Sequence, residues 1–125
     1  MVEKTLVLKL SDGADIVAEL EKLVKENNVN YGMLVSGCGK IKEFELISHE
    51  QKGGVGMTKF EKEFEVNAIS GKIQINKSGK IDSNIRVSVT STGFTQKAGQ
   101  LIKGKAAGQL EIGIRKIDFG KIIEA

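Results

Sequence analysis

The fold is decided by the stretch Asn84-Ile85-Arg86-Val87-Ser88-Val89-Thr90. Its apolar and polar residues alternate with a period of two, which is the pattern of a β-strand that buries one face and exposes the other. The exposed face would carry Asn84, Arg86 and Ser88, and Arg86 is one of only two arginines in the chain. A polar sheet face that carries a guanidinium group is suited to a ligand, so we treat it as the candidate surface.

The same alternation recurs along most of the chain. Residues 5–10 predict one strand, and the sequence from Tyr31 onward predicts a sheet, because short apolar alternations there are broken by glycines. The segments expected as strands in this part are 31–36, 41–48, 64–75, 85–90 and 110–117. Residues 76–80 predict a turn, and the glycine-rich residues 51–56 predict a mobile loop.

A single amphipathic helix interrupts the strands. Ile16, Leu20 and Val24 recur at helical spacing with charged residues on the opposite side, and Asn27-Asn28 ends the pattern. Side-chain oxygens in Ser11-Asp12-Gly13 are suited to cap the first turn. We therefore expect an α+β fold, a sheet with one main helix, in a single domain over residues 1–125.

Charge is divided unevenly along the chain. Residues 1–65 carry 9 lysines and 12 acidic residues, whereas residues 66–125 carry 8 lysines, 2 arginines and 4 acidic residues. The first part therefore has a charge of −3 and the second a charge of +6, which gives the net +3. A basic second half favours an anionic partner such as phosphate, a nucleotide or nucleic acid. Lysine is also the ordinary residue of solvated sheet edges, and that alternative stays open.

Cys38 is the only cysteine and His49 the only histidine. This excludes an intrachain disulfide, and also a zinc site built from histidine and cysteine within one protomer. The sequence has no apolar run long enough for a signal peptide or a membrane span. We therefore expect a cytoplasmic protein without membrane contact.

No catalytic group stands out in the sequence. The stretch Ser36-Gly37-Cys38-Gly39-Lys40 lacks the spacing of a phosphate-binding loop, and only Lys40 is near Cys38 to favour a thiolate. We expect Cys38 to be a small residue at a bend between strands, and His49 to be solvated at a strand end. The carboxylates expected to point outward and stay hydrated are Glu43, Glu45, Glu61, Glu63 and Glu65. An enzyme that uses Cys38 or His49 is therefore the least favoured function, and we expect no cofactor.

An ordered series of segments resembles a known family. The series comprises Asp12-Gly13-Ala14-Asp15-Ile16 after a first strand, then residues 35–41, 64–66, 69–73, 85–89, 98–101 (Ala-Gly-Gln-Leu), Gly104 and residues 110–112. No single motif is specific, but together they resemble the PPC ("plants and prokaryotes conserved") domain over about residues 8–114. The resemblance implies an antiparallel sheet with a helix packed on it, a homotrimer, and cytoplasmic prokaryotic proteins often labelled DNA-binding.

The candidate site departs from the pattern of this family. Many prokaryotic members carry three histidines that can hold a metal, where this sequence has Asn84, Arg86 and Gln100. Carboxamides are poor ligands for zinc-like ions and a guanidinium repels a cation, so we expect no metal. Arg86 could instead bind an anion, with Asn84 and Gln100 as further donors and Gly99 and Ser88 beside them. A pocket filled by water or packed at a subunit interface is an equal alternative.

These observations favour a non-enzymatic, oligomeric binding or regulatory module with a polar pocket for a small anion or a partner protein. The alternative is a DNA-binding protein that uses the basic second half of the chain. Two arginines, one tyrosine and the lack of a basic tail weaken that alternative, because duplex binders usually concentrate Lys and Arg on one face.

Overall fold

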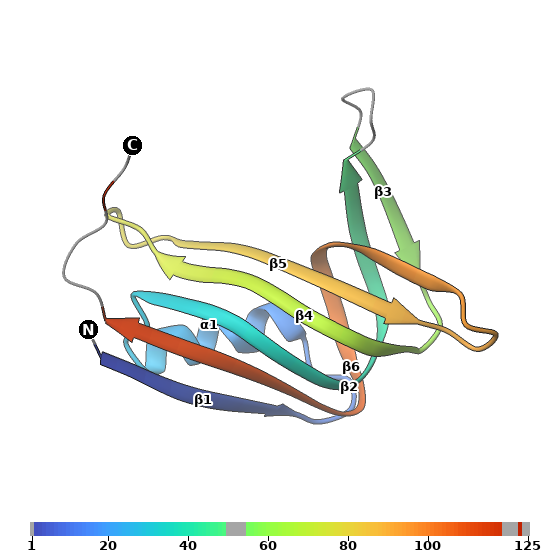
Figure 1. The fold of residues 1–125 in the computed structure, drawn as a ribbon, viewed down its shortest axis with the longest axis horizontal. Helices are drawn as coiled ribbons and strands as arrows, with labels where there is room; N and C mark the ends of the chain where they lie inside the picture. Colours follow the sequence, from blue (N-terminus) through green and yellow to red (C-terminus); the bar gives the residue numbers. More distant parts are fainter. Residues whose placement is uncertain (1, 50–54, 119–122, 124–125) are drawn as a thin grey trace.

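Strands form almost all of the regular structure. The computed structural model describes residues 2–49, 55–118 and 123 (Figure 1). The elements are β1 (Val2–Leu10), α1 (Ile16–Glu26), β2 (Tyr31–His49), β3 (Val55–Phe60), β4 (Phe64–Ile75), β5 (Ile81–Thr90) and β6 (Gln96–Asp118). Neighbouring strands all pair antiparallel. Among the described residues, no helix has the length and apolar character needed to cross a membrane.

The sheet is partly closed on itself by its last strand. Its strand order is β1-β6-β5-β4-β2-β3, with an additional pairing between β6 and β2. β6 pairs with β5 over residues 96–100, with β2 over 100–116 and with β1 over 110–118. Because β5 also pairs with β4, and β4 with β2, these four strands form a closed circuit of hydrogen-bonded neighbours. The C-terminal part of β2 pairs with β3 over residues 44–49 and with β6 over residues 45–47, and the β2–β3 hairpin projects from the rest of the sheet (Figure 1).

The helix covers one face of the sheet. Its apolar stripe, Ile16, Leu20 and Val24, is buried in the same core as inward-facing side chains of β2 and β6. The cap is Asp15, whose carboxylate accepts the backbone N–H of Ala18 at 3.0 Å. The helix was thus predicted within a residue of its ends, but the prediction that residues 11–13 would cap it was wrong.

The opposite face of the sheet, which we call the open face, has no helix on it. One row of cross-strand partners on this face consists of Thr5, Arg115, Met33, Lys72 and Asn84. Val7, Met33 and Val35 are 58%, 38% and 41% exposed. An apolar patch beside basic side chains is therefore accessible on the single chain.

Several expectations about individual strands were wrong. Residues 31–49 form one long strand and not two strands joined at a bend, because the irregularities near Cys38 are register shifts within β2. β6 begins at Gln96 and is much longer than the segment 110–117. β3 begins at Val55, inside the stretch expected to be a loop, while residues 51–54 lie outside the described residues. Glu45, expected to be hydrated, is only 7% exposed.

Asp12 links the loop before α1 to β6 through a hydrogen bond. Its carboxylate accepts the backbone N–H of Gly108 at 2.8 Å and the ammonium group of Lys42 at 3.0 Å. The Gly108 hydrogen bond, and then Lys42, hold the pKa of Asp12 below its usual value. A carboxyl group whose pKa is lowered by folding stabilises the protein at pH values above its unfolded pKa, and this contribution is lost as the pH falls through the folded pKa.

We expect Asp12→Ala to lower the melting temperature by a few degrees at pH 7. The difference from the wild type should shrink as the pH falls from about 4, the ordinary pKa of an aspartate in an unfolded chain, through the lower pKa that Asp12 has in the folded protein. Thermal unfolding followed by circular dichroism across this pH range measures it. Asp82→Ala, at an exposed position of β5, is the control and should change little. A pH-independent difference between Asp12→Ala and the wild type would contradict the role of the charge.

Candidate functional site

Arg86 lies at the centre of the polar surface. On β5 it stands opposite Gln100 of β6 on one side and Ser70 of β4 on the other. Asn84 precedes it by two residues on the same face of β5 and stands opposite Lys72. The closure of the sheet by β6 therefore brings Gln100 next to Arg86, although 14 positions separate them in the sequence.

Two clefts meet at Arg86. The first has a volume of about 250 Å³ and is lined by Ile47, Ser48, Arg86, Ala98, Gly99 and Gln100. The second, of about 370 Å³, is lined by Tyr31, Met33, Leu34, Ser70, Gly71, Lys72, Asn84 and Arg86. Among the residues that the structure describes, no carboxylate lines either cleft, and the charged side chains there are Lys72 and Arg86. The electrostatic environment of both clefts therefore favours a negatively charged group.

The side chains that could bind such a group are not engaged elsewhere. Arg86 is exposed, and it makes no hydrogen bond or ion pair with any residue that the structure describes. The same is true of the side chains of Asn84 and Gln100 within the described part of the chain. A guanidinium carries five N–H donors in a fixed plane, and each carboxamide adds two more. The site thus combines unused donors with positive charge.

The structure gathers four of the five residues proposed from the sequence. Asn84, Arg86, Gly99 and Gln100 all line the two clefts. Ser88 does not, and its hydroxyl lies 3.5 Å from the side-chain amide nitrogen of Asn67 instead.

Sequence reasoning missed several other residues of the clefts. Ser48 and Ser70 reach the site only through strand pairing, as does Lys72. The alternation within one strand gives no register between strands, so no signal in the sequence could have found them. Lys72 matters most among them, because it adds a second positive charge to the larger cleft.

The groups considered for catalysis lie apart from these clefts. Cys38 is exposed in β2 and stands opposite Glu111, whose carboxylate is 3.6 Å from the ammonium group of Lys9. Cys38 has no hydrogen-bonding partner among the described residues. The backbone of His49 ends β2, while its side chain lies outside the described residues.

The site does not fit a metal ion. The positions at which the resemblance implies histidines hold two carboxamides and a guanidinium, and a fixed positive charge opposes cation binding. In the ranges that the structure describes, no three His, Cys, Asp or Glu side chains gather in a way that could hold a metal. A metal-dependent role therefore has no support from this donor set.

A sheet closed by one long strand, with one helix on one face, is a fold found in solved prokaryotic proteins. A PPC protein from Pyrococcus horikoshii superposes with a TM-score of 0.82 at 15% identity, covering 95% of this chain and 82% of the other. The chain belongs to the Plants and Prokaryotes Conserved (PCC) domain family, whose model matches residues 1–118. The family resemblance drawn from the sequence is confirmed.

Two further structures show how differently such proteins are described. One is a metal-containing protein from Archaeoglobus fulgidus, with a TM-score of 0.77, 18% identity, and coverage of 90% of this chain and 79% of the other. The other is a candidate DNA-binding protein from Bacteroides thetaiotaomicron, with a TM-score of 0.82, 19% identity, and coverage of 92% and 80%. Among curated proteins there is no match. At these identities the likeness establishes the fold alone.

Proposed function

We propose that this chain is a non-enzymatic, oligomeric binding module that holds a small anion, or a carboxylate of a partner protein, in the clefts at Arg86. One observation carries the proposal. Arg86 has no hydrogen bond or ion pair to any described residue, and it stands between two clefts whose described lining residues include no carboxylate. An exposed arginine with a carboxylate nearby would usually pair with it, so its solitary position leaves the guanidinium for a ligand.

The chemistry of the site favours a planar or tetrahedral oxyanion. The guanidinium fork can donate two parallel hydrogen bonds to one carboxylate or phosphate group. Gln100 from one cleft and Asn84 from the other can donate to further oxygens, and Lys72 contributes charge on the side of Asn84. The ligand would then be held on rigid strands and not on loops, which fixes its orientation.

We also propose that the module is a homotrimer. The family resemblance implies this state, and the apolar patch of Val7, Met33 and Val35 on the open face supports it, because burying such a patch between copies would remove it from water. Light scattering would then give three times the 13.5 kDa mass of the chain.

The proposal predicts that inorganic phosphate stabilises the protein through Arg86. Millimolar phosphate should raise the melting temperature of the wild type by a few degrees, because a ligand that binds only the folded state stabilises it. We expect Arg86→Ala to lose most of this increase while keeping the oligomeric mass of the wild type. Differential scanning fluorimetry at constant ionic strength measures it.

Arg115→Ala is the matched control, since Arg115 is the other arginine and lies on the same open face but lines neither cleft. This variant should keep the phosphate effect. Equal losses in the two variants would reduce the effect to general attraction by positive charge, and the site at Arg86 would be abandoned.

DNA binding is the second candidate. It is supported by the net charge of +6 in residues 66–125 and by the placement of Lys72, Arg86 and Arg115 on one face. The description of the Bacteroides thetaiotaomicron protein adds to this support. Fluorescence anisotropy with a labelled duplex distinguishes the two functions: saturable binding with a steep salt dependence favours DNA, whereas no binding at low salt removes it.

A further inference from the structure

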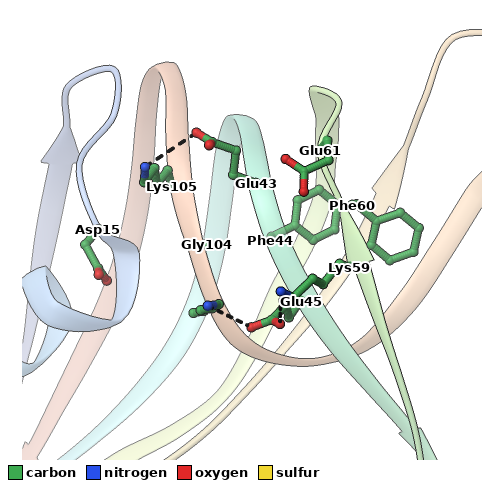
Figure 2. Close-up of a pocket in the computed structure, with 10 residues that line it drawn as sticks. Asp15, Glu43, Phe44, Glu45, Lys59, Phe60, Glu61, Gly104 and Lys105 are labelled. Atoms are coloured by element: carbon green, nitrogen blue, oxygen red, sulfur yellow. Dashed lines mark ion pairs between the residues drawn. The ribbon is translucent and has the colours of Figure 1, made fainter.

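A third cavity, separate from the clefts at Arg86, lies between the start of α1, the irregular middle of β2, β3 and β6. Its volume is about 360 Å³, within the range of small-molecule sites. It is lined by Asp15, Glu43, Phe44, Glu45, Lys59, Phe60, Glu61, Lys103, Gly104 and Lys105 (Figure 2). None of these residues lines either cleft at Arg86, so the cavity is a distinct candidate site.

An irregular backbone turns acidic side chains toward this cavity. The pairing of β2 with β6 shifts register between Lys42 and Glu45, so that β2 holds one extra residue there. Glu43 occupies this bulge with a φ of +46°, a conformation that L side chains rarely adopt. Glu45 follows two residues later and is buried, with only 7% of its surface exposed; among the described residues it is the charged residue that is buried. A strained bulge that buries a carboxylate beside a cavity is an arrangement typical of functional sites.

The charged groups around the cavity attract one another but leave hydrogen-bonding capacity unused. Glu45 lies 3.3 Å from the ammonium group of Lys103 and 3.7 Å from that of Lys59, and Glu43 lies 3.5 Å from Lys105 (Figure 2). Charge-assisted hydrogen bonds are shorter, at about 2.7–2.9 Å. These carboxylates and ammonium groups form no hydrogen bond among the described residues. The lysines therefore keep cationic N–H donors for a ligand, and the glutamates keep anionic oxygen acceptors.

The balance of charge selects the class of ligand. Four carboxylates and three ammonium groups line the cavity. A purely anionic ligand would meet four like charges, and a purely cationic one would meet three. A molecule that carries one positive and one negative group can place these two groups at opposite ends of the cavity. Figure 2 shows such ends: Glu43 and Glu61 lie on one side, and Glu45 with Lys59 on the other.

We propose that this cavity binds a small zwitterion of the amino-acid class with an apolar side chain. Its carboxylate accepts hydrogen bonds from the ammonium groups of Lys59 and Lys103, which are ion-paired with Glu45, and its ammonium group donates to Glu43 and Glu61. Its side chain lies against the ring of Phe60, which is stacked on Phe44 with ring centroids 5.0 Å apart. The site goes beyond the anion clefts and does not depend on them.

L-Leucine and two of its analogues test this proposal. Isoamylamine keeps the ammonium group and side chain but lacks the carboxylate, and 4-methylpentanoate lacks the ammonium group. We expect L-leucine to shift the backbone amide signals of residues 43–45, 59–61 and 103–105 with a dissociation constant of about 1 mM. Each analogue should bind at least about tenfold more weakly. Equal shifts by either analogue, or none by L-leucine at ten times that concentration, would overturn the proposal.

Two substitutions separate binding from folding. Glu43→Gly removes one carboxylate and at the same time relieves the backbone strain, so its melting temperature should be equal to or higher than that of the wild type. Its affinity for L-leucine should nevertheless fall about tenfold, as should that of Lys103→Gln. Arg86→Ala should bind L-leucine as the wild type does, which keeps this site separate from the phosphate test. Unchanged affinity in Glu43→Gly and Lys103→Gln would refute the assignment.

Discussion

Replacing Gly71 with alanine is expected to lower the free energy of unfolding by about 3–6 kcal/mol, a large fraction of the stability of a domain of this size. Gly71 has a φ of +116°, which strains any L side chain. A Cβ atom there would also run into the backbone carbonyl oxygen of Asn84 on β5. The clash can be relieved only by separating β4 from β5, which breaks the ladder next to Arg86. Urea denaturation followed by circular dichroism measures the loss.

Gly79→Ala is the matched control for this prediction. Gly79 also has a positive φ, +84°, but a Cβ atom there would meet nothing within 4 Å. Only the backbone strain remains, so the expected cost is about 1 kcal/mol. Similar losses in the two variants would show that the close approach of β5 to Gly71 has no energetic importance.

The second large effect is expected for Phe44→Ala, with a loss of about 3–5 kcal/mol in the free energy of unfolding. The side chain is fully buried, stacks on Phe60, and meets the ring of Phe64 edge-on with centroids 5.3 Å apart. Removing it would leave a cavity where β2 and β3 are held against β4, and the surrounding strands cannot close this cavity without breaking their pairing. Chemical denaturation provides the measurement.

Phe94→Ala serves as the comparison, because Phe94 is 91% exposed in the connection between β5 and β6. Its removal should change stability by no more than about 0.5 kcal/mol. If Phe44→Ala were as mild as this change, the aromatic cluster would not be part of the stabilising core.

The sequence was sufficient where structure depends on local periodicity. The spacing of Ile16, Leu20 and Val24 gave the helix, since a buried stripe with a period of 3.6 admits few other structures. The alternation around Arg86 likewise gave the strand that carries the candidate site. The polar outer face of that strand followed from the same pattern, because the side-chain period of a strand is fixed.

Properties that depend on pairing between distant segments could not be predicted. The burial of Glu45 follows from a bulge in β2, and a strand with an extra residue has the same alternation in sequence as one without it. Arg86 stands opposite Ser70 and shares a cleft with Lys72 because of the register between β4 and β5, and the sequence of a single strand does not encode that register. The sequence pattern did not predict β3, because glycines precede this strand and it has only six residues.

The position of β6 in the chain has a consequence for how the protein is made. β6 is the last of the described strands in chain order, yet β1, β2 and β5 all pair with it. Until residues 96–118 are available, the apolar side chains of Leu6, Leu8 and Leu10 on β1 lack the strand that pairs with them. Native contacts between the two ends of the chain also slow folding, because a long loop must close before they form. The nascent chain therefore cannot complete this core before residues 96–118 have been synthesised.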